Sequence, residues 1–148
     1  MKNSILLALK DSMTSWQTVD FLDGLSLCRE DCHITLLHVY RKPSASEQLM
    51  GKKFTEKERS RLLAFLQRAR DKLVENGYNP QNIKIELVID AYLTVADGII
   101  DQFKKGDFNM VVIGRRKMSK SEEFVLGDAS AKLCRAVEGA AVLVVKPK

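Results

Sequence analysis

The sequence alternates between short apolar segments of strand length and longer segments with helical periodicity. The five apolar segments span residues 4–9, 33–40, 83–89, 109–113 and 140–145. Between them, apolar side chains recur every three or four positions, as along one face of a helix, over residues 13–29, 55–76, 94–106 and 127–137. Because parallel strands are joined by crossovers that are usually helices, this alternation predicts an α/β fold: a doubly wound parallel sheet with helices on both faces.

The length and composition fit a single domain spanning residues 1–148. A chain of 148 residues buries about two thirds of its extended surface on folding, which is enough for a core without metal or disulfide staples. Apolar residues make up 45% and charged residues 29%, which excludes a disordered or fibrous chain. The longest apolar runs are far shorter than the roughly 20 residues that span a bilayer, and the N-terminus shows no signal-peptide cleavage site.

The three cysteines, Cys28, Cys32 and Cys134, indicate a reducing compartment. Their number is odd, and no pair has the spacing of a zinc or redox motif. We therefore expect free thiols and a cytoplasmic location.

Local signals mark several element boundaries. Gly77 follows the second helical segment at the position of a C-cap glycine. Thr94 followed by Asp97 resembles a capping box and predicts the start of the third helix. Residues 41–53, with proline, serine and glycine, and the polar residues 118–126 are predicted to be loops.

The formal net charge of +5 is concentrated between Arg41 and Lys72. This stretch holds ten basic and four acidic residues and alone carries +6. A basic face attracts phosphates, but an amphipathic helix also needs a solvated face. No aromatic-interleaved basic platform accompanies the charge, so we do not expect a nucleic-acid partner.

The segments that directly follow the strands are the expected place for a ligand site. In doubly wound sheets, ligands bind beyond the carboxyl ends of the strands, at the topological switch point. These segments are Lys10–Ser12, Val39–Tyr40, Asp90–Ala91 and the residues from Gly114 onward.

The stretch that begins at Gly114 is the most informative of these. A strand ends in this glycine, a basic loop of residues 115–117 follows, and Gly127 and Asp128 stand at a predicted helix start. Glycine lets backbone N–H groups approach a phosphate, and a helix N-terminus adds partial positive charge, so the pattern suits an anion. Spacing alone leaves the alternative open that both glycines only turn the chain.

Over nearly its whole length the chain resembles the universal stress protein family. The resemblance is carried by the opening strand and turn Ile5–Ser12, the strand Leu37–Val39, Asp107 before the strand Val111–Gly114, and the closing strand Val142–Val145. It implies the fold of that family, which is an adenine nucleotide alpha hydrolase-like sheet with strand order 3-2-1-4-5. We therefore expect two helices on each face of the sheet.

The nucleotide motif of the family is altered in this chain. The ATP-binding branch carries Gly-x2-Gly-x9-Gly-Ser/Thr, and the corresponding positions here are Gly114, Lys117, Gly127 and Asp128. The Lys117 side chain crowds the path that glycine leaves open to phosphate, although its ammonium offers a charge. Asp128 cannot donate to a phosphate and repels it, whereas at a helix start its carboxylate caps backbone N–H groups.

A third departure lies at the end of the first strand. Lys10 stands where the family places an aspartate near the ribose or adenine, and Asp11 follows it, on the other face by strand alternation. Lys10 and Asp128 are both expected near the carboxyl edge, where they could pair in place of a nucleotide. If the site is retained, the resemblance assigns nucleotide binding to Leu9, Lys10, Val39, Gly114, Arg116, Lys117, Gly127, Asp128 and Ala129.

The sequence shows no catalytic or metal-binding constellation. His33 and His38 lie at odd separation in one predicted strand, so they face opposite sides of the sheet. We expect neither enzymatic activity nor a metal. The closing strand is an apolar sheet edge that calls for a partner, and the resemblance implies a homodimer through Ala141, Leu143 and Val145.

We favour a cytoplasmic regulatory protein of the stress response that acts as a homodimer through an unidentified protein partner. Its nucleotide site is then degenerate, with no firm cofactor. The alternative is a member that binds ATP or AMP, with slow ATP hydrolysis. A basic module associated with nucleic acid is a third interpretation.

Overall fold

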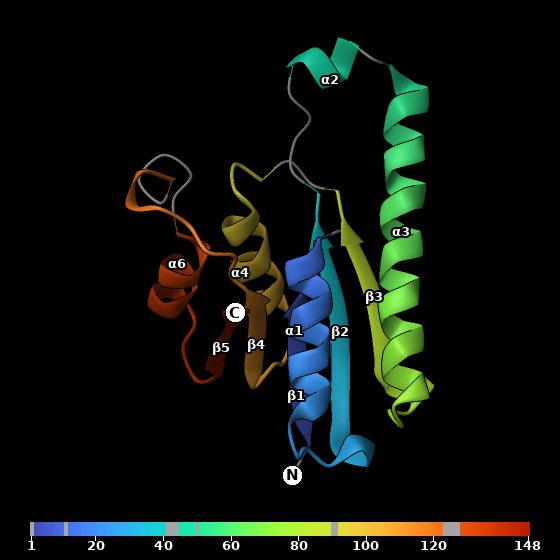
Figure 1. Cartoon of the computed structure of the whole chain (residues 1–148), viewed down its shortest axis with the longest axis vertical. Coiled ribbons are helices and arrows are strands. Elements are labelled where there is room, and N and C mark those ends of the chain that lie inside the picture. Colours follow the sequence, from blue (N-terminus) through green and yellow to red (C-terminus); the bar gives the residue numbers. More distant parts are fainter. Residues whose placement is uncertain (1, 11, 41–44, 50, 90–91, 123–127) are drawn as a thin grey trace.

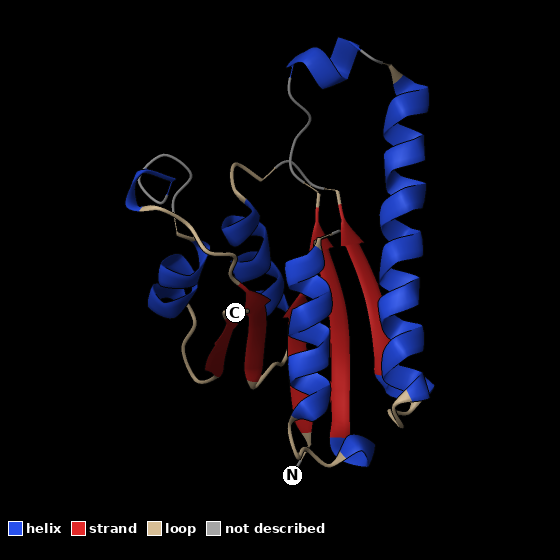
Figure 2. Ribbon diagram, viewed as in Figure 1, coloured by secondary structure: helices blue, strands red, loops and turns tan. Residues whose placement is uncertain are grey.

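The structure is a computed structural model that describes residues 2–10, 12–40, 45–49, 51–89, 92–122 and 128–148. Its strands are β1 (Asn3–Ala8), β2 (Cys32–Val39), β3 (Ile83–Val88), β4 (Met110–Gly114) and β5 (Ala141–Val145). Its α-helices are α1 (Met13–Gly24), α2 (Ala45–Leu49), α3 (Lys52–Glu75), α4 (Val95–Lys105) and α6 (Ala129–Ala136), and short 3₁₀ turns span Arg29–Asp31 and Pro80–Asn82. Figures 1 and 2 show this arrangement.

The strands form one parallel sheet in the order β3-β2-β1-β4-β5, which confirms the predicted fold and strand order. The central strand β1 pairs with β2 along its whole length and with β4 over residues 5–8. Strands β2 and β3 therefore follow one another on one side of β1, and β4 and β5 then follow on its other side. This reversal creates the switch point at the carboxyl ends of β1 and β4, where open sheets bind ligands.

Two helices cover each face of the sheet, as predicted. Helices α1 and α3 pack on one face and α4 and α6 on the other (Figure 1). In β1, Ile5 and Leu7 belong to the first core and Leu6 to the second, and all three are fully buried. A strand buried on both faces is apolar at every position, which is why this segment shows no alternation in the sequence.

Helix α1 is shorter than the periodicity predicts. It ends at Gly24 rather than at Arg29, and the next residue, Leu25, has extended backbone (φ −74°, ψ 142°). Glycine disfavours continuation of a helix because it retains the most conformational freedom in the unfolded chain. The residues after it lead into a separate 3₁₀ turn before β2.

Helix α3 begins earlier than predicted, at Lys52, and the predicted loop 41–53 contains α2 and the first two residues of α3. The apolar stripe that predicted a helix from Thr55 marks only the part of α3 that packs on the sheet. The first turns of α3 run past the carboxyl ends of the strands, and α2 lies beyond the same edge (Figure 1). Residues 120–122 are likewise helical within the second predicted loop.

The predicted N-cap of α4 and the glycine predicted to end α3 are both confirmed. Thr94 caps α4 by accepting a hydrogen bond from the backbone N–H of Asp97 (3.1 Å). Gly77 follows the C-cap of α3 with φ +102°, a conformation that favours glycine. None of the helices in the described part of the chain is long and apolar enough to cross a membrane.

Candidate functional site

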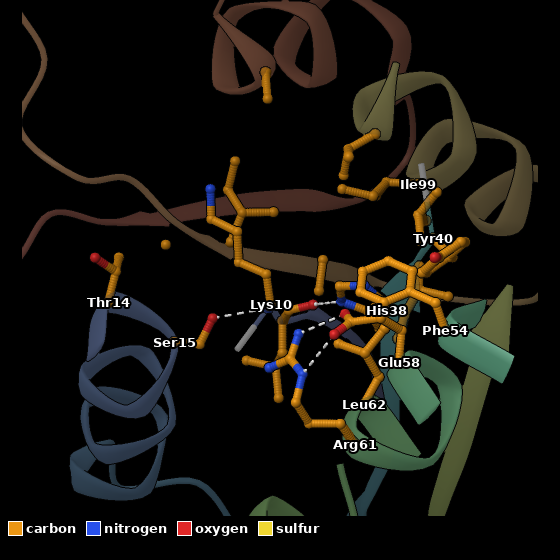
Figure 3. Close-up of a pocket in the computed structure, with 18 residues that line it drawn as sticks. Lys10, Thr14, Ser15, His38, Tyr40, Phe54, Glu58, Arg61, Leu62 and Ile99 are labelled. Atoms are coloured by element: carbon orange, nitrogen blue, oxygen red, sulfur yellow. Dashed lines mark hydrogen bonds and ion pairs between the residues drawn. The ribbon is translucent and has the colours of Figure 1, made fainter. Parts of the chain in front are cut away.

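A cavity of about 520 Å³ opens at the carboxyl edge of the sheet, at the switch point (Figure 3). Its walls come from the ends of β1, β2 and β4 and from the facing parts of α1, α3, α4 and α6. The lining residues are Ala8, Leu9, Lys10, Thr14, Ser15, Leu37, His38, Val39, Tyr40, Phe54, Glu58, Arg61, Leu62, Val95, Ile99, Ile113, Gly114 and Ala129. The volume lies within the range of ligand pockets, roughly 300–1,000 Å³.

Hydrogen bonds fix the floor of the cavity. The N–H of Leu9 donates to the carbonyl of Leu37 (2.8 Å), and Nδ1 of His38 lies 2.8 Å from the Leu9 carbonyl oxygen. Because a carbonyl can only accept, Nδ1 carries the hydrogen in this contact. The N–H of Lys10 donates to Oγ of Ser15 in α1 (2.9 Å). Both strand ends are thereby held, and the Lys10 side chain projects from a fixed backbone.

One end of the cavity, here called the apolar end, is formed by Tyr40, Phe54, Leu62 and Ile99. These residues come from the end of β2 and from the first halves of α3 and α4. In Figure 3, Tyr40, Phe54 and Ile99 lie on one side of the cavity and Thr14 lies on the other. The Lys10 side chain extends toward the Thr14 side.

An ion pair stands at the rim beside the apolar end. The guanidinium of Arg61 donates to both carboxylate oxygens of Glu58, at 2.8 Å and 3.3 Å. This hydrogen bonding lowers the pKa of Glu58 below its usual value, because it stabilises the ionised carboxylate. The charges of these two residues therefore compensate each other at the cavity mouth.

The other end, here called the capped end, consists of Arg115, Asp128 and Ser130, next to the lining residues Gly114 and Ala129. Asp128 is the N-cap of α6, and its Oδ1 accepts hydrogen bonds from the N–H groups of Ser130 (3.1 Å) and Ala131 (3.3 Å). The Ser130 hydroxyl donates to the same oxygen. The carboxylate therefore occupies the N–H groups that a bound anion would use at this helix start.

The capped end also contains its own counter-charge. The guanidinium of Arg115 lies 3.2 Å from Oδ2 of Asp128 and 3.3 Å from the Ser130 hydroxyl oxygen. The Ser130 hydrogen bond, supported by the Ala131 N–H and the Arg115 charge, lowers the pKa of Asp128 although burial opposes the shift. Asp128 is thus an ionised, paired carboxylate at neutral pH.

Gly114 allows α1 to pack directly against the end of β4. A Cβ at this position would lie 2.3 Å from Oγ1 of Thr18 and 2.9 Å from Cγ2 of Thr14. Thr18 is fully buried, and its hydroxyl donates to the Thr14 carbonyl (2.7 Å), so the Thr18 side chain cannot move aside without losing this bond. The glycine that begins the altered motif is needed here for close helix–strand packing.

The structure places about half of the predicted nucleotide residues at the cavity. The residues that line it are Leu9, Lys10, Val39, Gly114 and Ala129, and Asp128 adjoins it. Arg116 and Lys117 are not among the lining residues, and Arg116 instead pairs with Glu122 (2.9 Å). Gly127, Asp11 and Asp90–Ala91 lie outside the described residues.

The expected pairing of Lys10 with Asp128 is replaced by a different pair. Asp128 pairs with Arg115, whose N–H donates to the Val145 carbonyl (2.8 Å), so that the sheet register fixes Arg115 beside α6. The Lys10 side chain extends into the cavity (Figure 3). Among the described residues, Lys10 forms no ion pair.

Sequence reasoning did not find the contribution of α3. Phe54, Glu58 and Arg61 line the cavity. Phe54 lies just before the predicted start of the helix, and the other two belong to the basic stretch for which a solvated helix face was the alternative. The signal lay in the basic stretch, where Glu58 and Arg61 stand three positions apart and Phe54 interrupts the charges. Only the packing of α3 shows that this part faces the cavity.

The other candidate residues have structural places. His38 is half-buried and lines the cavity, whereas His33 lies on the other face of β2. Cys28 and Cys134 are exposed, Cys32 is buried, and all three are free thiols. Within the described residues, no group of three His, Cys, Asp or Glu side chains is arranged to hold a metal ion.

The sheet order and the cavity at its switch point define a doubly wound α/β protein of the adenine nucleotide alpha hydrolase-like class. Comparison with protein-family models then gives the family. The universal stress protein family matches residues 1–146, and the chain belongs to that family. This confirms the resemblance that the opening strand and turn, Asp107 and the closing strand indicate.

Solved structures agree with this fold. The chain is similar to the universal stress protein UspA from Lactobacillus plantarum (13% identity, TM-score 0.71, 97% of both chains covered). It is also similar to the universal stress protein from Archaeoglobus fulgidus in complex with dAMP (15% identity, TM-score 0.61, 99% of this chain and 98% of that chain). A family member from Arabidopsis thaliana with AMP bound gives 16% identity and a TM-score of 0.65 over 99% of this chain and 92% of that chain. A search of curated protein sequences finds no match.

Proposed function

We propose that this universal stress protein is a cytoplasmic regulator of the stress response that acts through protein contacts as a homodimer. Its nucleotide site is degenerate at the phosphate end, and it does not turn over ATP. The single observation that supports the degenerate site is the capped end of the cavity. There, the Asp128 carboxylate takes the two N–H groups of α6 and the Arg115 charge that a phosphate would need.

The physical consequence concerns affinity. A phosphate at the start of α6 must displace or face an ionised carboxylate, and it lacks the hydroxyl donor that serine or threonine supplies at this position of the family motif. One lost hydrogen bond costs about 0.5–1.5 kcal/mol, and repulsion between two anions adds a cost of similar size. Together these amount to roughly tenfold to several hundredfold in affinity, so we expect dissociation constants for ATP in the high micromolar range or above.

Calorimetry of ATP and AMP with the parent protein and with a restored variant tests this proposal. The restored variant carries Lys10→Asp, Lys117→Gly and Asp128→Ser, and we expect it to bind ATP more tightly than the parent. The matched control is Asp128→Asn, which removes the negative charge while it keeps an oxygen acceptor for the cap. Micromolar binding of ATP by the parent, or phosphate release from ATP in its presence, would contradict the proposal.

The proposed homodimer rests on β5, an edge strand with a single neighbour in the sheet. The Ala141 N–H donates to the Asn109 carbonyl (3.0 Å) on the β4 side, and the Val145 carbonyl accepts from the same side. Because backbone groups alternate along a strand, the N–H groups of Val142 and Val144 point away from β4, toward the open edge. A second copy of β5 can pair with these groups.

The side chains of β5 differ in what they offer to a partner. Ala141 is exposed and Leu143 is half-buried, whereas Val145 is only 6% exposed and packs into the core of its own chain. A lysine at Val145 would therefore disturb the fold, and it is a poor test of an interface. A substitution that removes an outward-facing backbone N–H is a sharper test of the interface.

We expect Val144→Pro to convert a dimeric parent into a monomer, since proline removes the outward N–H without breaking the β4 ladder. Val144→Thr is the matched control, because it keeps the N–H and the β-branched shape. Light scattering gives the oligomeric state, and circular dichroism verifies the fold of both variants. A parent that is monomeric at micromolar concentration, or a Val144→Pro variant that is folded and still dimeric, would refute this interface.

A second candidate function is binding of an adenine nucleotide. Two observations favour it: the cavity lies at the switch point and has ligand size, and structures of the family from A. fulgidus and A. thaliana contain dAMP and AMP. AMP carries one phosphate and so meets less repulsion at the capped end than ATP does. Micromolar binding of AMP by the parent would establish this second function.

A further inference from the structure

We propose that the cavity binds a small organic monoanion with an apolar or aromatic body, whose carboxylate pairs with Lys10. The inference rests on the proposed function, because it requires the phosphate end of the site to be closed. It names the class of ligand for which the remaining cavity is suited.

Within the part of the chain that the structure describes, the charges around the cavity leave the Lys10 ammonium for a ligand. Arg61 pairs with Glu58 at the rim, and Arg115 pairs with Asp128 at the capped end. Lys10 lines the cavity and, within the described part of the chain, forms no ion pair. Its backbone is held by Ser15, so its ammonium is tethered to a fixed point of the floor. Counted over the described residues alone, the cavity therefore presents about one uncompensated positive charge, which suits a ligand with one negative charge.

The opposite side of the cavity offers an apolar surface. Leu62 and Ile99 are each 3% exposed, and Phe54 and Tyr40 add two aromatic rings beside them. Figure 3 shows that these side chains and the Lys10 side chain occupy different sides of the same cavity. A ligand that spans the cavity thus needs an apolar body at one end and a charge at the other.

The capped end explains why the ligand carries one charge rather than several. A polyphosphate needs several donors or cations close together, and here the N–H groups of Ser130 and Ala131 already bind Asp128. A phosphate at the start of α6 would face this carboxylate. A single carboxylate at Lys10 avoids that repulsion and forms one charge-assisted hydrogen bond.

The test compares naphthoate with its neutral amide, naphthamide, by calorimetry or ligand-observed NMR. The two compounds share one aromatic body and differ in charge. For the parent protein we expect naphthoate to bind about fivefold to thirtyfold more tightly than naphthamide, as one charge-assisted contact provides. In Lys10→Gln this preference should disappear, because naphthoate binds more weakly while naphthamide is unaffected.

Two further variants separate the contributions. Lys104→Gln is the charge-matched control, because Lys104 is exposed in the last turn of α4 and does not line the cavity. It should leave the preference for naphthoate unchanged. Phe54→Ala should weaken the binding of both compounds by a similar factor, since it removes an aromatic ring from the apolar end. Thermal denaturation of each variant verifies that it remains folded.

The outcomes distinguish this inference from the proposed function. Equal binding of naphthoate and naphthamide by a parent that does not bind ATP would overturn the inference alone, as would no detectable binding of either compound. A preference for naphthoate that persists in folded Lys10→Gln would also overturn it. Micromolar binding of ATP would overturn the proposed function and, with it, the premise of a closed phosphate end.

Discussion

The two ends of the cavity are built from opposite kinds of contact. At the capped end, the Asp128 carboxylate satisfies the start of α6 and pairs with Arg115, so the polar groups bind one another. At the apolar end, Phe54 and Ile99 contribute carbon surface to the lining of the cavity. The difference shows that a single cavity can have one end whose polar groups are paired with one another and another end whose lining is apolar.

The largest expected effect concerns Gly114 and Gly98, two glycines at which a helix packs closely against a strand. Gly114→Ala should destabilise the protein by about 1–3 kcal/mol, because the added Cβ meets Thr18 and Thr14 of α1 at 2.3 and 2.9 Å. Gly98→Ala should cost less, although its Cβ would lie 2.5 Å from Cγ1 of Val39. Gly98 is inside α4, where alanine gains roughly 0.5–1 kcal/mol of helix propensity over glycine. Urea denaturation measures both.

Gly24→Ala is the matched control for these two substitutions. A Cβ there meets no heavy atom of the described residues within 4 Å, so the variant should be as stable as the parent or slightly more stable. Equal stability of Gly114→Ala and Gly24→Ala would show that the close approach of α1 to β4 is not required.

The next effect concerns the cap itself. Asp128→Ala removes the acceptor for two N–H groups of α6 and leaves Arg115 without this partner, which should cost about 0.5–2 kcal/mol of unfolding free energy. Asp128→Asn should cost less, because asparagine is also a good N-cap. Chemical denaturation measures the free energy of unfolding of both variants. An Asp128→Ala variant as stable as the parent would mean that water replaces the cap without loss of stability.

A smaller effect appears as a dependence of stability on pH. The pKa of Asp128 is lowered in the folded protein by the Ser130 hydroxyl and its other partners. Its stabilising contribution is therefore complete above the unfolded-state value, near 3.9, and is lost as the pH falls through the lower folded-state pKa. We expect the stability difference between the parent and Asp128→Asn to shrink over that acidic window. A difference that is constant with pH would contradict the assigned charge of Asp128.

The smallest expected effect lies at the rim of the apolar end. Glu58→Gln should change stability by less than about 0.5 kcal/mol, because Glu58 and Arg61 form an exposed pair three positions apart on one helix. Arg61→Gln should behave alike, and added salt should reduce both differences in denaturation experiments. A loss above about 1 kcal/mol would show that this pair supports the apolar end as strongly as the cap supports the other.

Much of the fold could be predicted from local patterns. The continuous apolar run that contains Ile5–Leu7 predicts a strand buried on both faces, and the structure buries it fully. Thr94 predicts the start of α4, and Asp128 the start of α6, because a cap depends on a side chain and the backbone two or three positions further on. Such signals need no knowledge of distant contacts.

The composition of the site could be predicted only in part. The strand-end residues Leu9 and Gly114 follow from the rule that ligands bind at the carboxyl edge, and both line the cavity. Phe54 and Arg61 could not be predicted, because a helical pattern fixes which face is apolar but not where the helix lies along the sheet. For the same reason, the sequence offered Lys10 as the partner of Asp128, whereas the sheet register brings Arg115 there.

The sequence by itself determined the order of strands and helices, the caps and the three departures from the nucleotide motif. These depend on residue type and on spacing over a few positions, which the chain fixes before it folds. Only the tertiary structure decided that the start of α3 forms one wall of the cavity, that Arg115 pairs with Asp128 and that Lys10 lines the cavity with no ion pair to another described residue. Those outcomes depend on which side chains meet across the sheet, and such meetings are set by packing of distant segments rather than by any local pattern.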